Sequence, residues 1–330
     1  MNQERSKATN WPKDEFGRSE ALGQLWWLVP LILGLLLVLP FAHRGNKPEV
    51  VAYCAQDQVY AEPLFREFEK RTGIKVQAVY DSEAVKTVGL ANRLMAERAH
   101  PQCDVFWGNE ELRTRQLAAA GIFRPTNGWA AFGYRSRRIV INTQQVALAK
   151  APKSLLELTN AIWRGKLVLA YPQFGTTSTH FHALRQYWGE TSWEGWCRAL
   201  AANKPLLVDG NSTVVRLVGG GHALVGLTDS DDVAAGQREG LPVMAMPMNG
   251  ETLLISNTAG VIDKAPHAEA AEKLFQFLQE PRMVERLVQA QALEGSSKTN
   301  ITTRTLEPDW AGLLRDLELT SGKLTEAFLR

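Results

Sequence analysis

The feature that most limits how this chain can fold is a repeated alternation of short apolar strands with amphipathic helices. In the first part of the chain, strands are expected at residues 49–54, 74–80 and 104–107. Helices with apolar residues at three- and four-residue spacing are expected at residues 60–71, 83–99 and 110–120. This alternation predicts an α/β fold with a mainly parallel sheet and helices on both faces.

A second region of the same kind begins after a break at residues 124–128, which contain proline and glycine. Its strands are expected at residues 138–142, 166–171, 206–208, 223–227 and 253–262. Its helices are expected at residues 179–188, 193–202, 212–218, 233–239, 268–279 and 283–289. Residues 48–330 are therefore long enough for two domains.

An apolar segment without charge, LWWLVPLILGLLLVLPFA, occupies residues 25–42. At about 1.5 Å per residue, a helix of this length can cross a bilayer core of roughly 30 Å. Lysines and arginines before it favour an N-terminus in the cytoplasm. We expect residues 1–24 to be a cytoplasmic leader and residues 25–42 to be an uncleaved transmembrane signal anchor. A cleaved secretory peptide is the alternative, which the long polar leader disfavours.

Composition and cysteine usage narrow the function classes. The formal net charge is only +2, which gives no indication of a nucleic-acid partner. The three cysteines, Cys54, Cys103 and Cys197, lack the spacing of a zinc site. Cys54 and Cys103 either pair across neighbouring strands or are free and buried. No cofactor fingerprint is evident, so we expect a protein that is not an enzyme and has no resident cofactor.

Three carboxylates, Asp229, Asp231 and Asp232, crowd together directly after the expected strand at residues 223–227. Ligands of open α/β sheets lie just outside the carboxyl ends of strands. Repulsion between acids so close together raises their pKa unless a cation, a donor or water compensates. The cluster therefore faces solvent, caps the helix that follows, or binds a ligand.

A second polar group marks the start of the helix expected at residues 179–188. Gly175 is followed there by four hydroxyl side chains, Thr176, Thr177, Ser178 and Thr179. Backbone N–H groups and the helix dipole favour an anion at such a place, by about 0.3–1 kcal/mol at exposed sites. The alternative is that these hydroxyls only cap the helix.

Several collinear stretches carry a resemblance to a known family. They are Val-Ala-Tyr-Cys-Ala-Gln-Asp at 51–57, Phe-Glu-Lys-Arg-Thr-Gly-Ile-Lys-Val at 68–76, Cys-Asp-Val-Phe-Trp-Gly-Asn-Glu at 103–110, Arg-Ser-Arg-Arg-Ile-Val-Ile-Asn-Thr at 135–143 and Asn-Thr-Ala-Gly-Val at 257–261. The chain resembles the family 1 extracellular solute-binding proteins. Within them it is most similar to the periplasmic ferric-ion-binding proteins of ABC importers.

The resemblance implies a two-lobed periplasmic-binding-protein fold, type II-like, in which hinge strands join two α/β lobes that close over a ligand. Lobe 1 is expected to comprise residues 43–131 and 252–300. Lobe 2 is expected to comprise residues 132–251 and 301–330. The strand crossings are expected near residue 134 and near residues 250–256.

The resemblance also implies which residues bind the ligand on one side of the cleft. Ferric-binding relatives often carry an imidazole after the first strand, where this chain has Asp57 preceded by Gln56. Their adjacent tyrosine pair matches Ser230 and Asp231, so the phenolate pair is absent here. If a cation binds, the resemblance points to Asp57, Asp229 and Asp231 as its ligands, because carboxylates suit hard cations.

The same resemblance implies further ligand-binding positions. A glutamate ligand of the relatives matches Asn109, with Glu110 next to it. The relatives hold an anion where this chain has residues 175–179, and Asn211 and Arg135 are expected to add contacts. The basic run at residues 135–138 is also expected to be partly a solvated face. Ser82 and Glu83 either touch the ligand or form a simple turn.

Together these positions define the expected function. The expected ligand-binding residues are Gln56, Asp57, Ser82, Glu83, Asn109, Glu110, Arg135, Gly175, Thr176, Thr177, Ser178, Asn211, Asp229, Ser230 and Asp231. The chain is expected to be a monomeric solute-binding protein, anchored outside the cytoplasmic membrane, in the periplasm or extracellular, that delivers a solute to an ABC permease. A phosphonate or other zwitterion suits its facing charges, as does a metal–anion pair. Alternatives are ferric binding through carboxylates, a ligand-sensing ectodomain and an enzyme of the same fold.

Overall fold

The computed structural model describes residues 48–330 except 82–85, 249, 299–300, 302–303 and 330. The expected leader at residues 1–24, the anchor at residues 25–42 and the candidates Ser82 and Glu83 lie outside the described residues. Within the part that is described, no helix combines the length and the apolar character needed to cross a membrane. Residues 48–330 form one compact unit by themselves.

The described residues contain nine strands in one continuous order, β2-β1-β3-β9-β4-β7-β5-β6, with β8 pairing to β4. The strands are β1 Glu49–Cys54, β2 Lys75–Val79, β3 Val105–Gly108, β4 Trp129–Asn142, β5 Leu167–Ala170, β6 Leu206–Val208, β7 Val225–Asp229, β8 Val243–Met246 and β9 Leu254–Val261. Strands β1, β2 and β3 run parallel, as do β5, β6 and β7. The predicted α/β alternation is therefore present.

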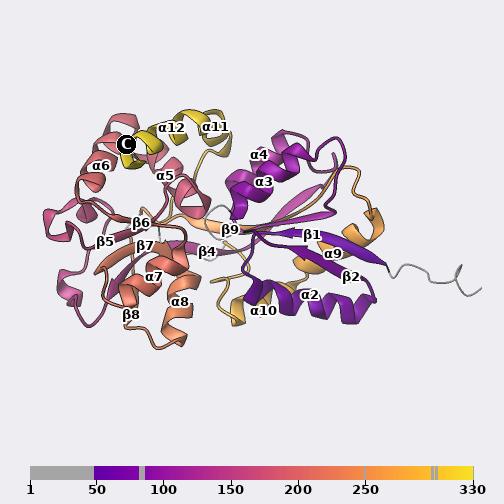
Figure 1. Cartoon of the computed structure of the whole chain (residues 1–330), viewed down its shortest axis with the longest axis horizontal. Coiled ribbons are helices and arrows are strands. Elements are labelled where there is room, and N and C mark those ends of the chain that lie inside the picture. Colours follow the sequence, from indigo (N-terminus) through magenta and orange to yellow (C-terminus); the bar gives the residue numbers. More distant parts are fainter. Residues whose placement is uncertain (1–47, 82–85, 249, 299–300, 302–303, 330) are drawn as a thin grey trace, which may run out of the picture. The chain divides into compact units, whose positions relative to one another are not determined.

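Helices follow most of the strands and cover both faces of the sheet (Figure 1). They are α2 Gln58–Thr72, α3 Lys86–Ala96, α4 Glu111–Ala119, α5 Gly175–Trp188, α6 Glu190–Ala202, α7 Asn211–Gly219, α8 Ser230–Arg238, α9 Ala268–Gln279, α10 Pro281–Gln289, α11 Trp310–Arg315 and α12 Leu317–Leu329. Helix α12 packs on α5 and α6, whereas α11 contacts both α4 and α5.

Strand β4 divides the sheet into two strand groups. Its residues 129–136 pair with β9, next to β3, β1 and β2; we call these the first strand group. Its residues 137–142 pair with β7 and β8, next to β5 and β6; we call these the second strand group. Figure 1 shows β4 and β9 running between the two groups. The parallel strands of both groups end facing the region between them.

The predicted extent of β4 was wrong, because the strand begins nine residues before the expected start at residue 138. The early part contains Gly133, Arg135 and Arg137, residue types that obscure a strand pattern in the sequence. Helices α5 and α8 also begin earlier than predicted, at Gly175 and Ser230. Strand β8 was not predicted at all, since it is a short apolar run that alternates weakly.

Burial of apolar side chains on both faces of each strand group stabilises the fold. In the first strand group, Phe68 of α2 and Trp107 of β3 lie in one core together with side chains of α9. Phe106 of β3 lies in the core on the opposite face of the sheet. In the second group, Trp193 and Phe181 fill the core beside α5 and α6. All three cysteines are buried thiols outside any disulfide, so Cys54 and Cys103 do not form a disulfide with each other.

A glycine forms a bulge in β4 a few residues before the strand changes partners. The pairing of β4 with β9 shifts register between Phe132 and Arg135. Gly133 lies in this bulge with φ of 56°, in the left-handed region. A Cβ atom on it would lie 2.5 Å from Leu293 Cδ1. The chain therefore needs glycine here for both conformation and space.

We expect Gly133→Ala to destabilise the protein more than Gly165→Ala does. Gly165 also has a positive φ, of 67°, but a Cβ there would meet nothing within 4 Å. Gly165→Ala should lower the free energy of unfolding by about 1–2 kcal/mol, the cost of a left-handed residue. Gly133→Ala should cost about 1–3 kcal/mol more because it overpacks Leu293. Urea unfolding measures both; equal losses would contradict the packing argument.

Candidate functional site

A pocket with about 570 Å³ of empty space, part of it open to solvent, lies between the two strand groups. It is lined by residues that follow parallel strands of both groups, where ligands of α/β sheets bind. The lining residues are Asp57, Thr87, Asn109, Arg135, Ala170, Tyr171, Phe174, Gly175, Thr176, Thr177, Asp209, Gly210, Asn211, Asp229, Asp231 and Asp232. We call this the central pocket.

A buried arginine and aspartate pair holds one wall of the central pocket. Arg137 on β4 and Asp229 at the end of β7 are directly opposite in the antiparallel register. Arg137 Nη1 donates to Asp229 Oδ1 at 2.7 Å. The Arg137 side chain is fully buried and also donates to the hydroxyls of Thr176 and Thr177, at 3.2 and 3.1 Å.

The acceptor capacity of Asp229 is largely used by protein donors. Its Oδ2 accepts from Thr176 Oγ1 at 2.8 Å, Asn211 Nδ2 at 3.2 Å and Arg135 Nε at 3.3 Å. Burial acts to raise the pKa of Asp229, but Arg137 and Arg135 outweigh it and hold the pKa below its usual value. Asp229 is therefore an ionised residue that positions its neighbours.

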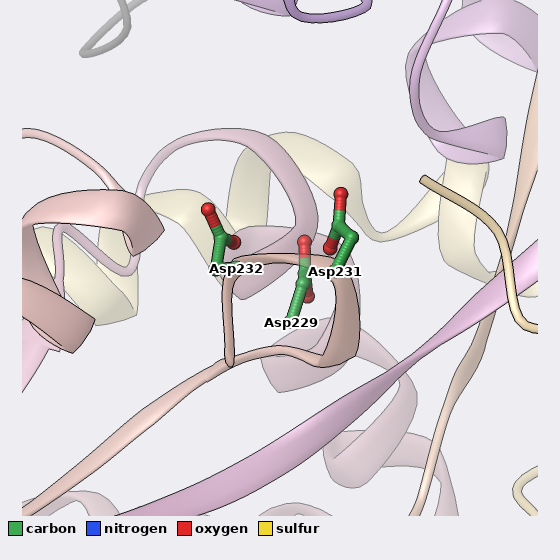
Figure 2. A group of neighbouring side chains, drawn as sticks. All are labelled: Asp229, Asp231 and Asp232. Carbon is green, nitrogen blue, oxygen red and sulfur yellow. The ribbon is translucent and has the colours of Figure 1, made fainter. Parts of the chain in front are cut away.

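Asp231 and Asp232, in the first turn of α8, differ from Asp229. Figure 2 shows the three carboxylates grouped around the start of this helix, and their ligand atoms lie within 4.8 Å of one another. Asp231 is only 6% exposed, and its Oδ1 has no hydrogen-bond partner among the described residues. The same oxygen forms an ion pair with Arg135 Nε, at 3.3 Å.

Burial and the crowding of negative charge raise the pKa of both of these acids. Burial raises the pKa of Asp231 to about 7, and repulsion from Asp229 and Asp57 adds to the rise, against the attraction of Arg135. Burial raises the pKa of Asp232 well above its usual value, and repulsion from Asp231, Asp229 and Asp57 adds to the rise. The expected rise in pKa is therefore found at Asp231 and Asp232 but not at Asp229.

The hydroxyl-rich start of α5 lies at the pocket, but its side chains serve the buried pair. Thr176 and Thr177 contact Arg137 and Asp229, and Asn211 Nδ2 donates to Thr176 Oγ1 at 3.0 Å. The N-cap residue Phe174 offers no side-chain cap, so these hydroxyls do not cap the helix. The N–H groups of the first turn of α5 are what this wall can offer to an anion.

The basic run at residues 135–138 is not a solvated face at two of its arginines. Arg135 is 3% exposed, and Arg137 is fully buried. Arg135, expected to meet an anion, lines the central pocket and contacts Asp229, Asp231 and Asn257. Only Arg138 is partly exposed, in an ion pair with Glu294.

Four of the expected ligand-binding residues lie outside the lining of the central pocket and have structural partners. Gln56 accepts from Asn257 Nδ2 at 3.4 Å, and Ser178 is hydrogen-bonded to His182. Ser230 Oγ accepts from the backbone N–H of Ser136 at 3.2 Å. Glu110 caps α4 by accepting from two backbone N–H groups, and it accepts from Thr179 of α5 at 2.9 Å.

Sequence reasoning missed some residues that the structure brings to the pocket. Tyr171 and Asp209 directly follow β5 and β6, so the rule that ligands bind at the carboxyl ends of strands could have found them. Arg137 could have been found from alternation along β4, since it shares a face with Arg135. The other missed lining residues are Thr87, Ala170, Phe174 and Gly210. Asp232, which also lines the pocket, belongs to the acid cluster found in the sequence but was not among the expected ligand-binding residues.

We expect substitutions at the two neighbouring aspartates to act differently on stability. Asp229→Asn leaves Arg137 buried without its counter-ion and should lower the free energy of unfolding by about 3–5 kcal/mol. Asp231→Asn removes an acid whose pKa is raised by folding. The folded state therefore binds more protons than the unfolded state between about pH 4 and pH 7, so wild-type stability falls as pH rises through that window.

Urea unfolding at pH 5 and pH 8 measures both effects. Asp231→Asn should gain stability relative to the wild type as pH rises, because the variant no longer carries that proton linkage. If the free energy of unfolding depends on pH equally in the two proteins, folding does not raise the pKa of Asp231.

Comparison with known proteins places this chain in a family. Residues 50–290 match the family described as bacterial extracellular solute-binding protein. A Fe(3+)-binding periplasmic protein of Serratia marcescens is 28% identical over 209 residues, which are 58% of this chain and 60% of the relative. The major ferric iron-binding protein of Neisseria meningitidis is 24% identical over 170 residues, 46% of this chain and 50% of that protein. The chain thus spans three fifths or less of the length of these two relatives.

Solved structures show the same fold. Iron-bound HitA from Pseudomonas aeruginosa superposes with a TM-score of 0.69 at 20% identity, covering 86% of this chain and 97% of that one. AfuA from Actinobacillus pleuropneumoniae, with fructose-6-phosphate bound, gives 0.75 at 18% identity, covering 86% and 99%. The expected periplasmic-binding-protein fold and the resemblance to ferric-binding proteins are confirmed. Because the family match covers more than half of the sequence, this chain belongs to the bacterial extracellular solute-binding proteins.

Proposed function

We propose that this chain is the solute-binding component of an ABC importer and captures a small solute with a cationic centre in the central pocket. The observation that carries the proposal is Asp231, a buried carboxylate at the pocket with one oxygen that no described residue hydrogen-bonds. A buried polar atom without a partner is costly, so a ligand that supplies the partner gains that free energy.

The charge of the pocket lining supports a cationic ligand group. Among the described lining residues, five are aspartates and one, Arg135, is an arginine. Arg137 lies behind the wall and is committed to Asp229. The remaining negative charge favours either a metal ion, for which carboxylates are suitable hard ligands, or an ammonium group.

Helix starts beside the acids support an anionic group on the same solute. The first turn of α5, at Gly175 and Thr176, and the first turn of α7, at Asn211, both lie at the pocket. Neither helix has a side-chain cap at its N-cap residue. A zwitterion such as an aminophosphonate or amino acid, or a metal–anion pair, suits the acids and the helix starts together.

Two observations favour binding over catalysis. The described residues that line the pocket include no histidine, cysteine or lysine. The two histidines of α5 are buried, and burial lowers the pKa of His180 to about 3, with His180 Nε2 hydrogen-bonded to the carbonyl of Glu251. Neither histidine is placed for proton transfer in the pocket.

Thermal melts of the chain from Pro48, with a panel of solutes, test the proposed ligand class. The panel comprises ferric citrate, Mn²⁺, an aminophosphonate, amino acids and a sugar phosphate. A ligand at 100 times its Kd should stabilise the native state by about 2.7 kcal/mol. Asp231→Asn should weaken binding of the active solute at least about tenfold, since a lost charge contact is worth more than about 1.4 kcal/mol.

Asp263→Asn, a substitution away from the central pocket, is the matched control and should bind as the wild type does. If only the sugar phosphate binds and Asp231→Asn has no effect, the cationic centre is wrong. Chemical conversion of a bound solute would instead identify an enzyme of the same fold.

We also propose that residues 25–42 anchor the protein to the cytoplasmic membrane, with Pro48–Arg330 in the periplasm beside its permease. The full chain should remain with membranes after a high-salt wash, because burial of an apolar helix does not depend on salt. A chain beginning at Pro48 and exported by a separate signal should be soluble. Recovery of a shortened, soluble full-chain product would show a cleaved signal peptide.

A further inference from the structure

Arg135 occupies an unusual position among the acids of the central pocket. Its Nε lies 3.3 Å from Asp229 Oδ2 and 3.3 Å from Asp231 Oδ1. Its Nη1 donates to Asn257 Oδ1 at 3.3 Å. The side chain is 3% exposed and lines the pocket, so its guanidinium contacts both the acids and the space where a solute would lie.

We propose that Arg135 is a resident counter-ion that the cationic group of a solute must displace from Asp231, and that it thereby sets how much positive charge a solute needs to bind. The proposal rests on the proposed function, because it concerns the same carboxylates. Arg135 thus competes, inside the protein, with the cationic group of the solute for the same carboxylates.

The contacts of Arg135 with the acids are weak enough to be exchanged. Its hydrogen bond to Asp229 is 3.3 Å long, at the far end of the normal range, whereas that from Arg137 is 2.7 Å. Its contact with Asp231 has an ion-pair distance but is not a hydrogen bond, because Asp231 Oδ1 has no hydrogen-bond partner among the described residues. The guanidinium therefore neutralises Asp231 incompletely.

Neighbouring groups can absorb the loss of these contacts. If Arg135 moves, Asp229 keeps its hydrogen bonds from Arg137, Thr176 and Asn211. Arg135 keeps an acceptor in Asn257, whose amide is in turn hydrogen-bonded to Gln56. Displacement thus leaves no buried acid without a donor, provided that the solute supplies one to Asp231.

The competition is always present because a guanidinium does not lose its proton in the working pH range. Burial works against the charge of Arg135, but the four nearby aspartates, led by Asp231, outweigh it and raise its pKa. A singly charged ammonium group would only replace one charge by an equal one. A multiply charged metal ion gains more from the same carboxylates than it loses by displacing Arg135.

Arg135 also connects the site to the strand that joins the two groups. Its backbone pairs with Ile255 of β9 in the first strand group. Asp231 follows β7 in the second strand group (Figure 2). Exchange of Arg135 for a solute cation therefore replaces a contact between the two strand groups by one made through the solute.

Calorimetric titration with Mn²⁺ alone, at pH 8 in chloride buffer, tests the competition. Arg135→Gln should bind Mn²⁺ roughly tenfold to a thousandfold more tightly than the wild type, because a neighbouring charge changes such equilibria by about one to three powers of ten. Arg135→Lys keeps the charge and should stay within about threefold of the wild type. Arg138→Gln, on the same strand but partly exposed, is the matched control.

Asp231→Asn, alone and combined with Arg135→Gln, separates the two proposals. The gain from Arg135→Gln should disappear when Asp231 is asparagine. Arg135→Gln that folds normally and binds Mn²⁺ no more tightly than the wild type would overturn the counter-ion role. If Asp231→Asn weakens Mn²⁺ binding in neither background, the proposed cation site itself fails. Should Arg135→Gln not fold, Arg135→Met, which keeps the apolar stem, is used in its place.

Discussion

The buried pair of Arg137 and Asp229 is the interaction on which the pocket depends. It lies between neighbouring strands, β4 and β7, so the sheet itself fixes the distance between guanidinium and carboxylate. The side chains of Thr176 and Asn211 reach the same pair from two other helix starts. Four separate segments of the chain are thus held together by hydrogen bonds that would be costly to leave unmade in a buried place.

This arrangement separates two kinds of acid within four residues of sequence. Asp229 accepts hydrogen bonds from four donors, whereas Asp231 Oδ1 has no hydrogen-bond partner in the part of the chain that the structure describes. The difference arises because Asp229 ends a strand directly opposite Arg137, whereas Asp231 lies in the first turn of α8. A buried charge that the protein leaves incompletely paired is a common property of binding sites, where the ligand supplies what is missing.

The fold could be predicted from the sequence to a large extent, because strand and helix periods and their alternation are local properties. The position of the acids at a strand end could also be predicted, since Asp229 follows an apolar run. The partners of the acids could not, because Arg135 and Arg137 meet them only through the pairing of β4 with β7, about 90 residues apart in sequence. For the same reason Glu110 was expected to bind a ligand, although its donors include Thr179 of α5.

Helix α11 connects the chain's last residues to both sides of the pocket. Leu313 and Leu317 bury their side chains against Leu112 of α4, while α12 packs on α5 and α6. Asp316, between α11 and α12, is held by Arg185 of α5 at 3.2 Å. Any widening of the pocket that separates α4 from α5 must disrupt this small cluster of packed leucine side chains. Separation of α4 from α5 would therefore expose the apolar side chains of Leu112, Leu313 and Leu317 to water, which costs free energy.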